Sequence, residues 1–442
     1  MAIDPKASTA ELVRLRDLRP LTPDEHALTQ RICAKITDLI RTRTEQIKSG
    51  QLDPATALPA SNWDPDADQP FQEGFRFLIR GEYEAINRLR LHTPFTAVDL
   101  ATQEYNSGGR FVPYLSADFD QQFAARVPLL IHWTKRYHLL VEHLPKSLHV
   151  TYPPRLGEIG CSYQGGVINH DAYAYQERVN LLLECGVIDL IRARIANGQC
   201  VNILEIGAGY GGLAHALASI FPAGINYILC DLPETMLCSS LYLGITKPHA
   251  RHRFYEPGGL SDLKEPPHET RFVYLPNYQL PDLAAHRLPI DLAINTLSFP
   301  EMTAAQVTNY ATILKVLLGN TGMMFEQNWD GRWLGLLDCK SILADFFPYR
   351  QSFSGRSIPA RSKGKCDLWS NQPWKALIPQ STLPFRKPSE RYRLFLWRIC
   401  SLASIPHWGL SRLREALFDC LGPRLFQLIK NTWNRLGGQM RG

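Results

Sequence analysis

Residues 201–212, VNILEIGAGYGG, join a run of apolar residues to a loop rich in glycine. The apolar run has the composition of a buried strand. Gly207, Gly209 and Gly211 suit a sharp turn into a helix, because glycine tolerates positive φ and lets a ligand approach the main chain closely. A second apolar run ends nineteen positions after the loop at Asp231, which is then placed to accept hydrogen bonds from ribose hydroxyls. The pattern predicts a site for a nucleotide-like cofactor.

The glycines alone do not select the cofactor. Residues 207–212 also satisfy GxGxxG, the fingerprint of dinucleotide-binding proteins, so an NAD(P)-dependent oxidoreductase stays open. Glu205 favours a different cofactor, because a carboxylate two residues before the first glycine would repel a pyrophosphate at the helix N-terminus. A cofactor with an amino group and a sulfonium accepts such a neighbour. The alternative is that Glu205 only caps or pairs locally.

The order acid-x-Gly-x-Gly-x-Gly in EIGAGYG resembles the first motif of class I S-adenosylmethionine-dependent methyltransferases, and Asp231 resembles their ribose-binding acid. Residues 157–191, 227–243 and 291–310 extend the likeness to the sugar O-methyltransferase family found among bacterial glycan genes. The likeness covers about residues 145–375. Its methyltransferase part is specific, whereas its sugar part rests on overall similarity.

This resemblance implies S-adenosylmethionine as the cofactor and a sugar or glycan hydroxyl as the acceptor. In that family the first acid lies near the methionine end of the cofactor. The matching cofactor-binding positions of this sequence are Glu205, Gly207, Ala208, Gly209, Gly211, Asp231 and Leu232.

The region 151–380 is predicted to be the catalytic domain, with a class I methyltransferase fold. Short β-like runs beginning at residues 202, 226, 271, 291 and 322 alternate with helical patterns. Strands that alternate with helices indicate an α/β, Rossmann-like, doubly wound and mostly parallel sheet. Two further runs, at 349–355 and 365–371, are candidates for an antiparallel edge.

The flanking regions differ from this pattern. Residues 1–150 are predicted to form a helical region or lid, with helical patterns at 25–47, 71–90 and 123–144 and a loop at 52–70. Residues 381–442 are predicted to form a basic, amphipathic helical tail. From residue 385 onward eleven Lys and Arg face three Asp and Glu, a net charge of +8, which leaves the rest of the chain at −2.

Methyl transfer to a hydroxyl needs a group that takes the acceptor's proton. Glu301, after the fourth predicted strand, is the first candidate, and its alternative role is to complement the dipole of the following helix. His170 and Asp171 are the second candidates, since histidine titrates near neutral pH. Asn169 or Asp171 is equally suited to cap the helix that follows.

Composition bounds the remaining possibilities. The ten cysteines form no CxxC pair and no His/Cys cluster, so we predict reduced thiols and no metal site. No stretch of the chain reads as a signal peptide or a membrane span, which predicts a cytoplasmic protein.

The basic tail has three candidate uses: peripheral contact with the inner face of the membrane, contact with an acidic partner, or packing on the catalytic domain. Nucleic acid is not expected, because no recognised binding motif accompanies the charge. A methyltransferase for another small hydroxylated metabolite and a non-catalytic glycan-assembly module stay open, as does the oligomeric state.

Overall fold

The structure is a computed structural model. It describes residues 14–15, 19–60, 78–92, 133–328, 336–354 and 365–378. Of two compact units, the first comprises Met1–Phe353 and Cys366–Ser381. The predicted tail at 381–442 lies outside the described residues. Within the described ranges, no helix has both the length and the apolar character needed to cross a membrane.

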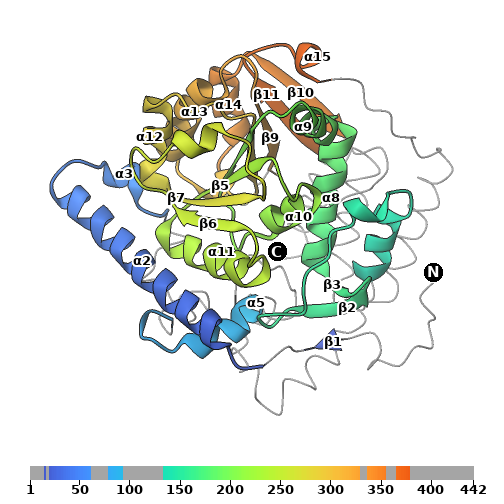
Figure 1. Ribbon diagram of the computed structural model, residues 1–442. Coiled ribbons are helices and arrows are strands. Elements are labelled where there is room, and N and C mark those ends of the chain that lie inside the picture. Colours follow the sequence, from blue (N-terminus) through green and yellow to red (C-terminus); the bar gives the residue numbers. More distant parts are fainter. Residues whose placement is uncertain are drawn as a thin grey trace, which may run out of the picture. The chain divides into compact units, whose positions relative to one another are not determined.

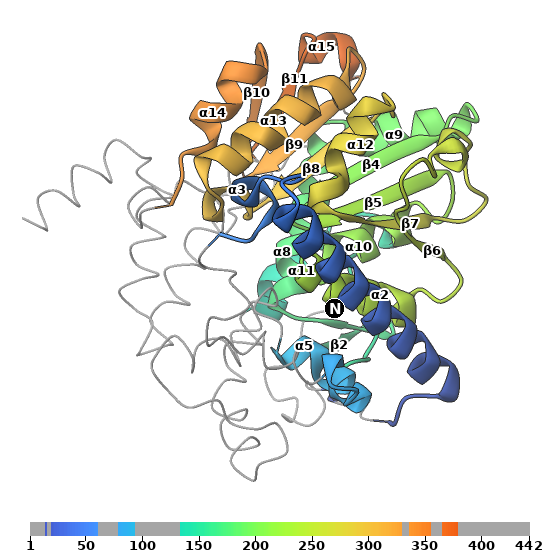
Figure 2. The ribbon, with the colours of Figure 1, turned by 90° about the vertical axis from the view of Figure 1, so that its left-hand side faces the viewer.

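The first unit is built around an eight-stranded sheet. Its strands are β4 (Val201–Ile206), β5 (Ile225–Asp231), β6 (Arg251–Phe254), β7 (Arg271–Pro276), β8 (Leu292–Thr296), β9 (Met323–Gln327), β10 (Tyr349–Ser354) and β11 (Lys365–Ser370). They lie in the order β10-β11-β9-β8-β4-β5-β7-β6 (Figure 1 and Figure 2). The six strands from β9 to β6 pair in parallel, and β11 runs antiparallel to β9.

This topology confirms the predicted α/β, Rossmann-like, doubly wound fold. All five predicted parallel strands are present, and so is the predicted edge at 349–355 and 365–371. Edge strand β6 was not predicted, because its sequence RHRF is half-exposed and mostly polar and lacks the apolar run of an inner strand.

Helices cover both faces of the sheet. They are α8 (His170–Glu184), α9 (Val187–Ala196), α10 (Gly212–Ile220), α11 (Pro233–Thr246), α12 (Leu280–Ala285), α13 (Ala304–Leu318), α14 (Cys339–Phe346) and α15 (Trp374–Leu377). A single apolar core joins one face of β4 and β5, including Leu204 and Ile228, to α12, α13 and α14. Figure 2 shows α12, α13 and α14 on one face of the sheet and α8, α10 and α11 on the other. Because side chains alternate along a strand, Glu205 and Tyr227 point toward the face opposite this core.

The N-terminal region is helical where it is described. The predicted helix at 25–47 is α2 (Pro23–Lys48), which begins with a capping box between Thr22 and Glu25. It packs along α11 (Figure 1), where Arg43 forms a buried bidentate ion pair with Glu234.

The prediction of a loop over residues 52–70 is wrong in part. Residues Pro54–Ala57 form the single-turn helix α3, because Asp53 caps the amide of Ala55 and Pro54 is preorganised for the first helical position.

The pattern predicted at 71–90 contains η2 (Tyr83–Arg88) and leads into α5 (Leu89–His92). The pattern predicted at 123–144 contains a helix over 133–141. A small antiparallel sheet was not predicted. Its strands are β1 (Arg14–Leu15), β2 (Ile159–Tyr163) and β3 (Gly166–Ile168).

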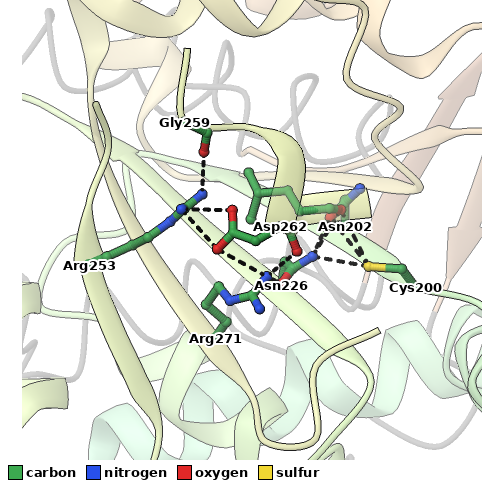
Figure 3. Close-up of polar contacts among 8 residues, drawn as sticks. Cys200, Asn202, Asn226, Arg253, Gly259, Asp262 and Arg271 are labelled. Atoms are coloured by element: carbon green, nitrogen blue, oxygen red, sulfur yellow. Dashed lines mark hydrogen bonds and ion pairs between the residues drawn. The ribbon is translucent and has the colours of Figure 1, made fainter. Parts of the chain in front are cut away.

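A polar network closes the sheet at the amino-terminal ends of its strands (Figure 3). Asn226 donates from Nδ2 to Asn202 Oδ1 at 2.9 Å and to Cys200 Sγ at 3.0 Å, and it accepts from Arg271 Nη1 at 2.9 Å. Buried polar groups need such partners. We assign this cluster to structure, because it lies at the strand edge opposite the glycine loop.

Candidate functional site

The glycine loop lies where β4 ends and α10 begins. Gly207, Gly209 and Gly211 all have positive φ, at 74°, 59° and 88°. A Cβ at Gly207 would stand 2.3 Å from Ser298 Oγ, so this position also needs glycine for space. Gly211 is the N-cap of α10 and provides no side-chain cap. The predicted turn is therefore present, with a helix N-terminus behind it.

Asp231 stands at the end of the neighbouring strand β5 and is bonded to the loop. Its Oδ2 accepts from the Gly209 amide at 3.1 Å, and its Oδ1 accepts from the Leu232 amide at 2.8 Å. Burial raises the pKa of Asp231 to about 7, although both amide hydrogen bonds oppose the shift. The structure thus brings the predicted ribose acid to the predicted loop.

Glu205 is almost fully buried on the opposite side of β4 from the apolar core. The Tyr227 hydroxyl donates to Glu205 Oε2 at 2.7 Å. Burial raises the pKa of Glu205 to about 8, while the Tyr227 hydrogen bond and the nearby positive charge of Arg178 oppose the shift. Local pairing of Glu205 is therefore present, but its partner is a neutral hydroxyl, and no ion pair to Glu205 is formed by the residues that the structure describes.

Arg178 adds a buried cation to this region. It lies on α8 with its guanidinium 4.6 Å from the centroid of the Tyr175 ring, and its Nε donates to Gln327 Oε1 at 3.2 Å. Both Tyr175 and Arg178 were omitted from the predicted site. The sequence offered one indication that these two residues belong to the site, namely their position on the helix before the glycine loop. The contact between Arg178 and Gln327 joins positions 149 residues apart, so sequence spacing does not predict it.

The turn after β8 is attached to the start of the glycine loop. Asn295 Nδ2 and Ser298 Oγ both donate to the Ile206 carbonyl, at 3.0 and 3.2 Å. Between them Leu297 has a positive φ of 68° and is 41% exposed. A non-glycine residue in this conformation is uncommon and clusters at functional sites. Glu301 follows in η6 (Phe299–Glu301) and is half-buried.

His170 and Asp171 begin α8, where Asn169 is the N-cap and accepts from the Ala172 amide at 3.0 Å. Both candidates are buried. Asp171 Oδ2 accepts from Arg90 Nη2 at 2.8 Å, and the His170 ring lies 4.3 Å from that of Trp133. This geometry favours a structural role for Asp171. As catalytic groups, Glu301, His170 and Asp171 stay predictions.

The N-terminal region also lies at the carboxyl-terminal ends of the strands, where the glycine loop is. Asn277 and Tyr278, which follow β7 in η5 (Asn277–Gln279), donate to the carbonyls of Ala57 at 3.2 Å and Leu39 at 3.0 Å. Gln306 on α13 donates to the Leu58 carbonyl at 2.7 Å. Elements that follow β7 and β8 are thus bonded to residues 39–58. Among the described residues, no group of three His, Cys, Asp or Glu side chains is placed to hold a metal ion.

Comparison with known proteins returns fold likeness only. No family model matches the chain, and no curated protein matches it. Human methyltransferase-like protein 13, solved with S-adenosylhomocysteine, is 13% identical, with 55% of this chain and 93% of that chain covered and a TM-score of 0.30. Spermidine synthase from Thermotoga maritima is 15% identical, with 54% and 76% covered and a TM-score of 0.30. An amino pentose methyltransferase from Micromonospora echinaspora, solved with S-adenosylmethionine, is 15% identical, with 38% and 59% covered and a TM-score of 0.22.

Two of these proteins are named as a methyltransferase or methyltransferase-like protein, and the third is named as a spermidine synthase. Their low identities and TM-scores carry no argument about the activity of this chain. The fold assignment rests on the strand order, and the functional argument rests on the residues at the glycine loop.

Proposed function

We propose that this protein is an S-adenosylmethionine-dependent O-methyltransferase that acts on a sugar hydroxyl in glycan or nucleotide-sugar metabolism. The hydrogen bond from the Gly209 amide to the Asp231 carboxylate carries the proposal. In a dinucleotide-binding protein a pyrophosphate lies against such a loop. Here Asp231 already takes a loop amide and Glu205 lies behind it, and a pyrophosphate would oppose the ionisation of both acids. A ligand that offers hydroxyl donors and a positive charge fits both acids.

The residues present fit that cofactor. Asp231 is placed to accept from ribose hydroxyls, and the Leu232 amide beside it supports the carboxylate at 2.8 Å. Gly207 keeps the loop close to the turn after β8, because a side chain there would collide with Ser298. Glu205 is the acid that would face the methionine end, as the family resemblance implies. When bound, S-adenosylmethionine supplies a methyl group on a sulfonium.

The reaction is an in-line displacement. The residues of this chain would have to hold the acceptor oxygen in line with the bound methyl donor and exclude water, and the donor's sulfur would keep the electrons of the carbon–sulfur bond. The acceptor's hydroxyl proton must pass to a base. We assign this role first to Glu301, because it follows the turn that is hydrogen-bonded to the glycine loop at Ile206. Asp171 is less suited, since its carboxylate is already paired with Arg90.

The substitution Glu301→Gln tests this assignment. It preserves size and removes the proton acceptor, so we expect kcat to fall by about 10²–10⁴-fold with little change in the affinity for S-adenosylhomocysteine. His170→Ala is the companion variant for the second candidate. Transfer of a labelled methyl group to an extracted sugar pool is the assay. Wild-type rates in both variants would show that the base lies elsewhere.

The same assay separates the other functions. A labelled product that is not a sugar would indicate a methyltransferase for another hydroxylated metabolite. Binding of S-adenosylhomocysteine without turnover on any extract would favour a non-catalytic glycan-assembly module. Binding of NAD(H) in place of S-adenosylhomocysteine would favour an oxidoreductase and overturn the proposal.

A further inference from the structure

A buried ion cluster connects the N-terminal region to the segment before α8. Arg90, on α5, is fully buried and donates from Nε and Nη2 to the two carboxylate oxygens of Glu158, the latter at 3.0 Å. Its Nη2 also donates to Asp171 at 2.8 Å. Glu158 accepts a further hydrogen bond from Asn169 Nδ2 at 2.6 Å. Bidentate pairing of this kind fixes the plane of the guanidinium as well as its position.

The guanidinium of Arg90 lies over the ring of Tyr210, a residue of the glycine loop. Arg90 Cζ lies 3.6 Å from the centroid of the Tyr210 ring, which is fully buried. Tyr210 stands between Gly209 and Gly211. Its ring is also packed edge-on against Tyr242, with 5.0 Å between the ring centroids and 87° between the ring planes. The only bulky side chain of the loop is therefore clamped from outside the loop.

The loop needs contacts from outside to keep a single conformation. Gly209 and Gly211 both have positive φ, and glycine loses more conformational freedom than any other residue when it is fixed. The same loop must present its amides in one arrangement, since preorganised contacts bind more tightly than contacts that are ordered on binding. Fixing the Tyr210 ring fixes the main chain between the two glycines.

We propose that Arg90 is a positioning residue for the cofactor site, and that it acts through its contact with Tyr210 to hold the glycine loop in its binding conformation. This inference rests on the proposed function, in which the loop binds S-adenosylmethionine. The planar guanidinium is essential, because a lysine ammonium cannot pair in bidentate fashion and stack on a ring at the same time. A segment outside the predicted catalytic domain thus contributes to cofactor affinity.

Two variants test the contact, each with a matched control. Arg90→Lys keeps the charge and removes the stacked plane, and Arg194→Lys makes the same change in the Arg194–Asp291 pair beside the amino-terminal end of β8. Tyr210→Leu removes this ring and leaves the Arg90 ion pairs intact, and Tyr137→Leu removes an equally buried ring that packs against Tyr163 and not against the loop. The readouts are the Kd for S-adenosylhomocysteine, the unfolding temperature, and hydrogen exchange of residues 206–213 in the ligand-free protein.

We expect Arg90→Lys and Tyr210→Leu to raise the Kd by at least about tenfold and to speed exchange in the loop, whereas both controls stay within about threefold of wild type. Equal affinity in the test variants, or equal losses in test and control variants, would overturn the inference. If wild type binds no S-adenosylhomocysteine, the proposed function fails, and loop exchange alone then decides whether Arg90 orders the loop: unchanged exchange in Arg90→Lys rejects it.

Discussion

Glu205 and Asp231 place two buried carboxylates at the glycine loop. Burial raises the pKa of Glu205 to about 8 and that of Asp231 to about 7. A cationic ligand favours the ionised acids, so binding of S-adenosylmethionine should release protons. We expect its Kd to fall by roughly tenfold or more between pH 6 and pH 8.5, measured by calorimetry in buffers of different ionisation enthalpy.

Glu205→Gln is the control for this pH dependence and carries a second prediction. Because the folded-state pKa of Glu205 lies above the unfolded value, the folded protein binds more protons, and the stability of the ligand-free protein falls as pH rises from about 4 to about 8. Glutamine at position 205 has no titrating group, so this fall in stability with rising pH is absent in the variant. The variant should therefore unfold at a higher temperature than wild type at pH 8.5, yet bind S-adenosylmethionine with a flatter pH profile. A stability equal to wild type at that pH would contradict the burial of a charged Glu205.

The glycine loop is the element on which the site depends, and Gly207→Ala tests its geometry. Alanine at this position must adopt a φ of 74° and would place its Cβ 2.3 Å from Ser298 Oγ. Gly198→Ala is the matched control, since its φ is 70° and nothing lies within 4 Å of the added Cβ.

We expect Gly198→Ala to cost about 1–2 kcal/mol of stability without an effect on binding. Gly207→Ala should cost more and raise the Kd for S-adenosylhomocysteine by at least about tenfold, since the turn after β8 must move away. Chemical denaturation and calorimetry give the two quantities. Similar behaviour of the two variants would show that Ser298 does not define the loop.

Elements with a local signal could be predicted, and elements with a tertiary origin could not. Strands β4 and β5 were identified because parallel strands covered on both faces are nearly continuous apolar runs. Strand β6 has no such run. Helix α3 is a single turn of four residues, too short for a helical repeat of apolar residues, and its only local signal is Asp53 before Pro54. In the small sheet, β1 pairs with β2, which lies far from it in sequence, whereas β2 and β3 form a short hairpin.

The candidate site divides in the same way. The loop glycines, Glu205 and Asp231 were found because the motif holds them at fixed spacing. Arg90 could not be found, because its partner Asp171 lies 81 residues away and its contact with Tyr210 depends on how a separate segment packs. Spacing within one element reveals a motif, and it does not reveal which distant side chains support that motif.

The described N-terminal helices belong to the same compact unit as the sheet. Arg43 on α2 and Glu234 on α11 form a buried bidentate pair. We expect Arg43→Met to destabilise the whole unit by about 3–5 kcal/mol, because it leaves a carboxylate buried without its partner. Lys35→Met on the same helix removes an exposed pair with Glu256 at 3.8 Å and should change stability by less than about 1 kcal/mol.

Thermal unfolding followed by circular dichroism and by hydrogen exchange measures both variants. A single cooperative transition that shifts to lower temperature in Arg43→Met is the expected result. Loss of protection in α2 alone, with the sheet unaffected, would show instead that the N-terminal helices unfold independently of the site.

The basic C-terminal segment lies outside the described residues, and its net charge of +8 carries a separate proposal. We propose that it contacts the anionic inner face of the membrane, where each basic residue near the surface contributes about 1 kcal/mol. The full chain should sediment with anionic liposomes at low salt, and a chain that ends at residue 384 should not. Equal sedimentation of the two chains would reject membrane contact and favour an acidic partner or packing on the first unit.

Isothermal titration of the full chain with S-adenosylhomocysteine, run in parallel with NADH, tests the central claim most directly. The two carboxylates at the glycine loop predict saturable, one-site binding of S-adenosylhomocysteine that Glu205→Gln weakens, and no binding of NADH. Binding of NADH with no heat from S-adenosylhomocysteine would contradict the assignment of this loop to a methyl donor.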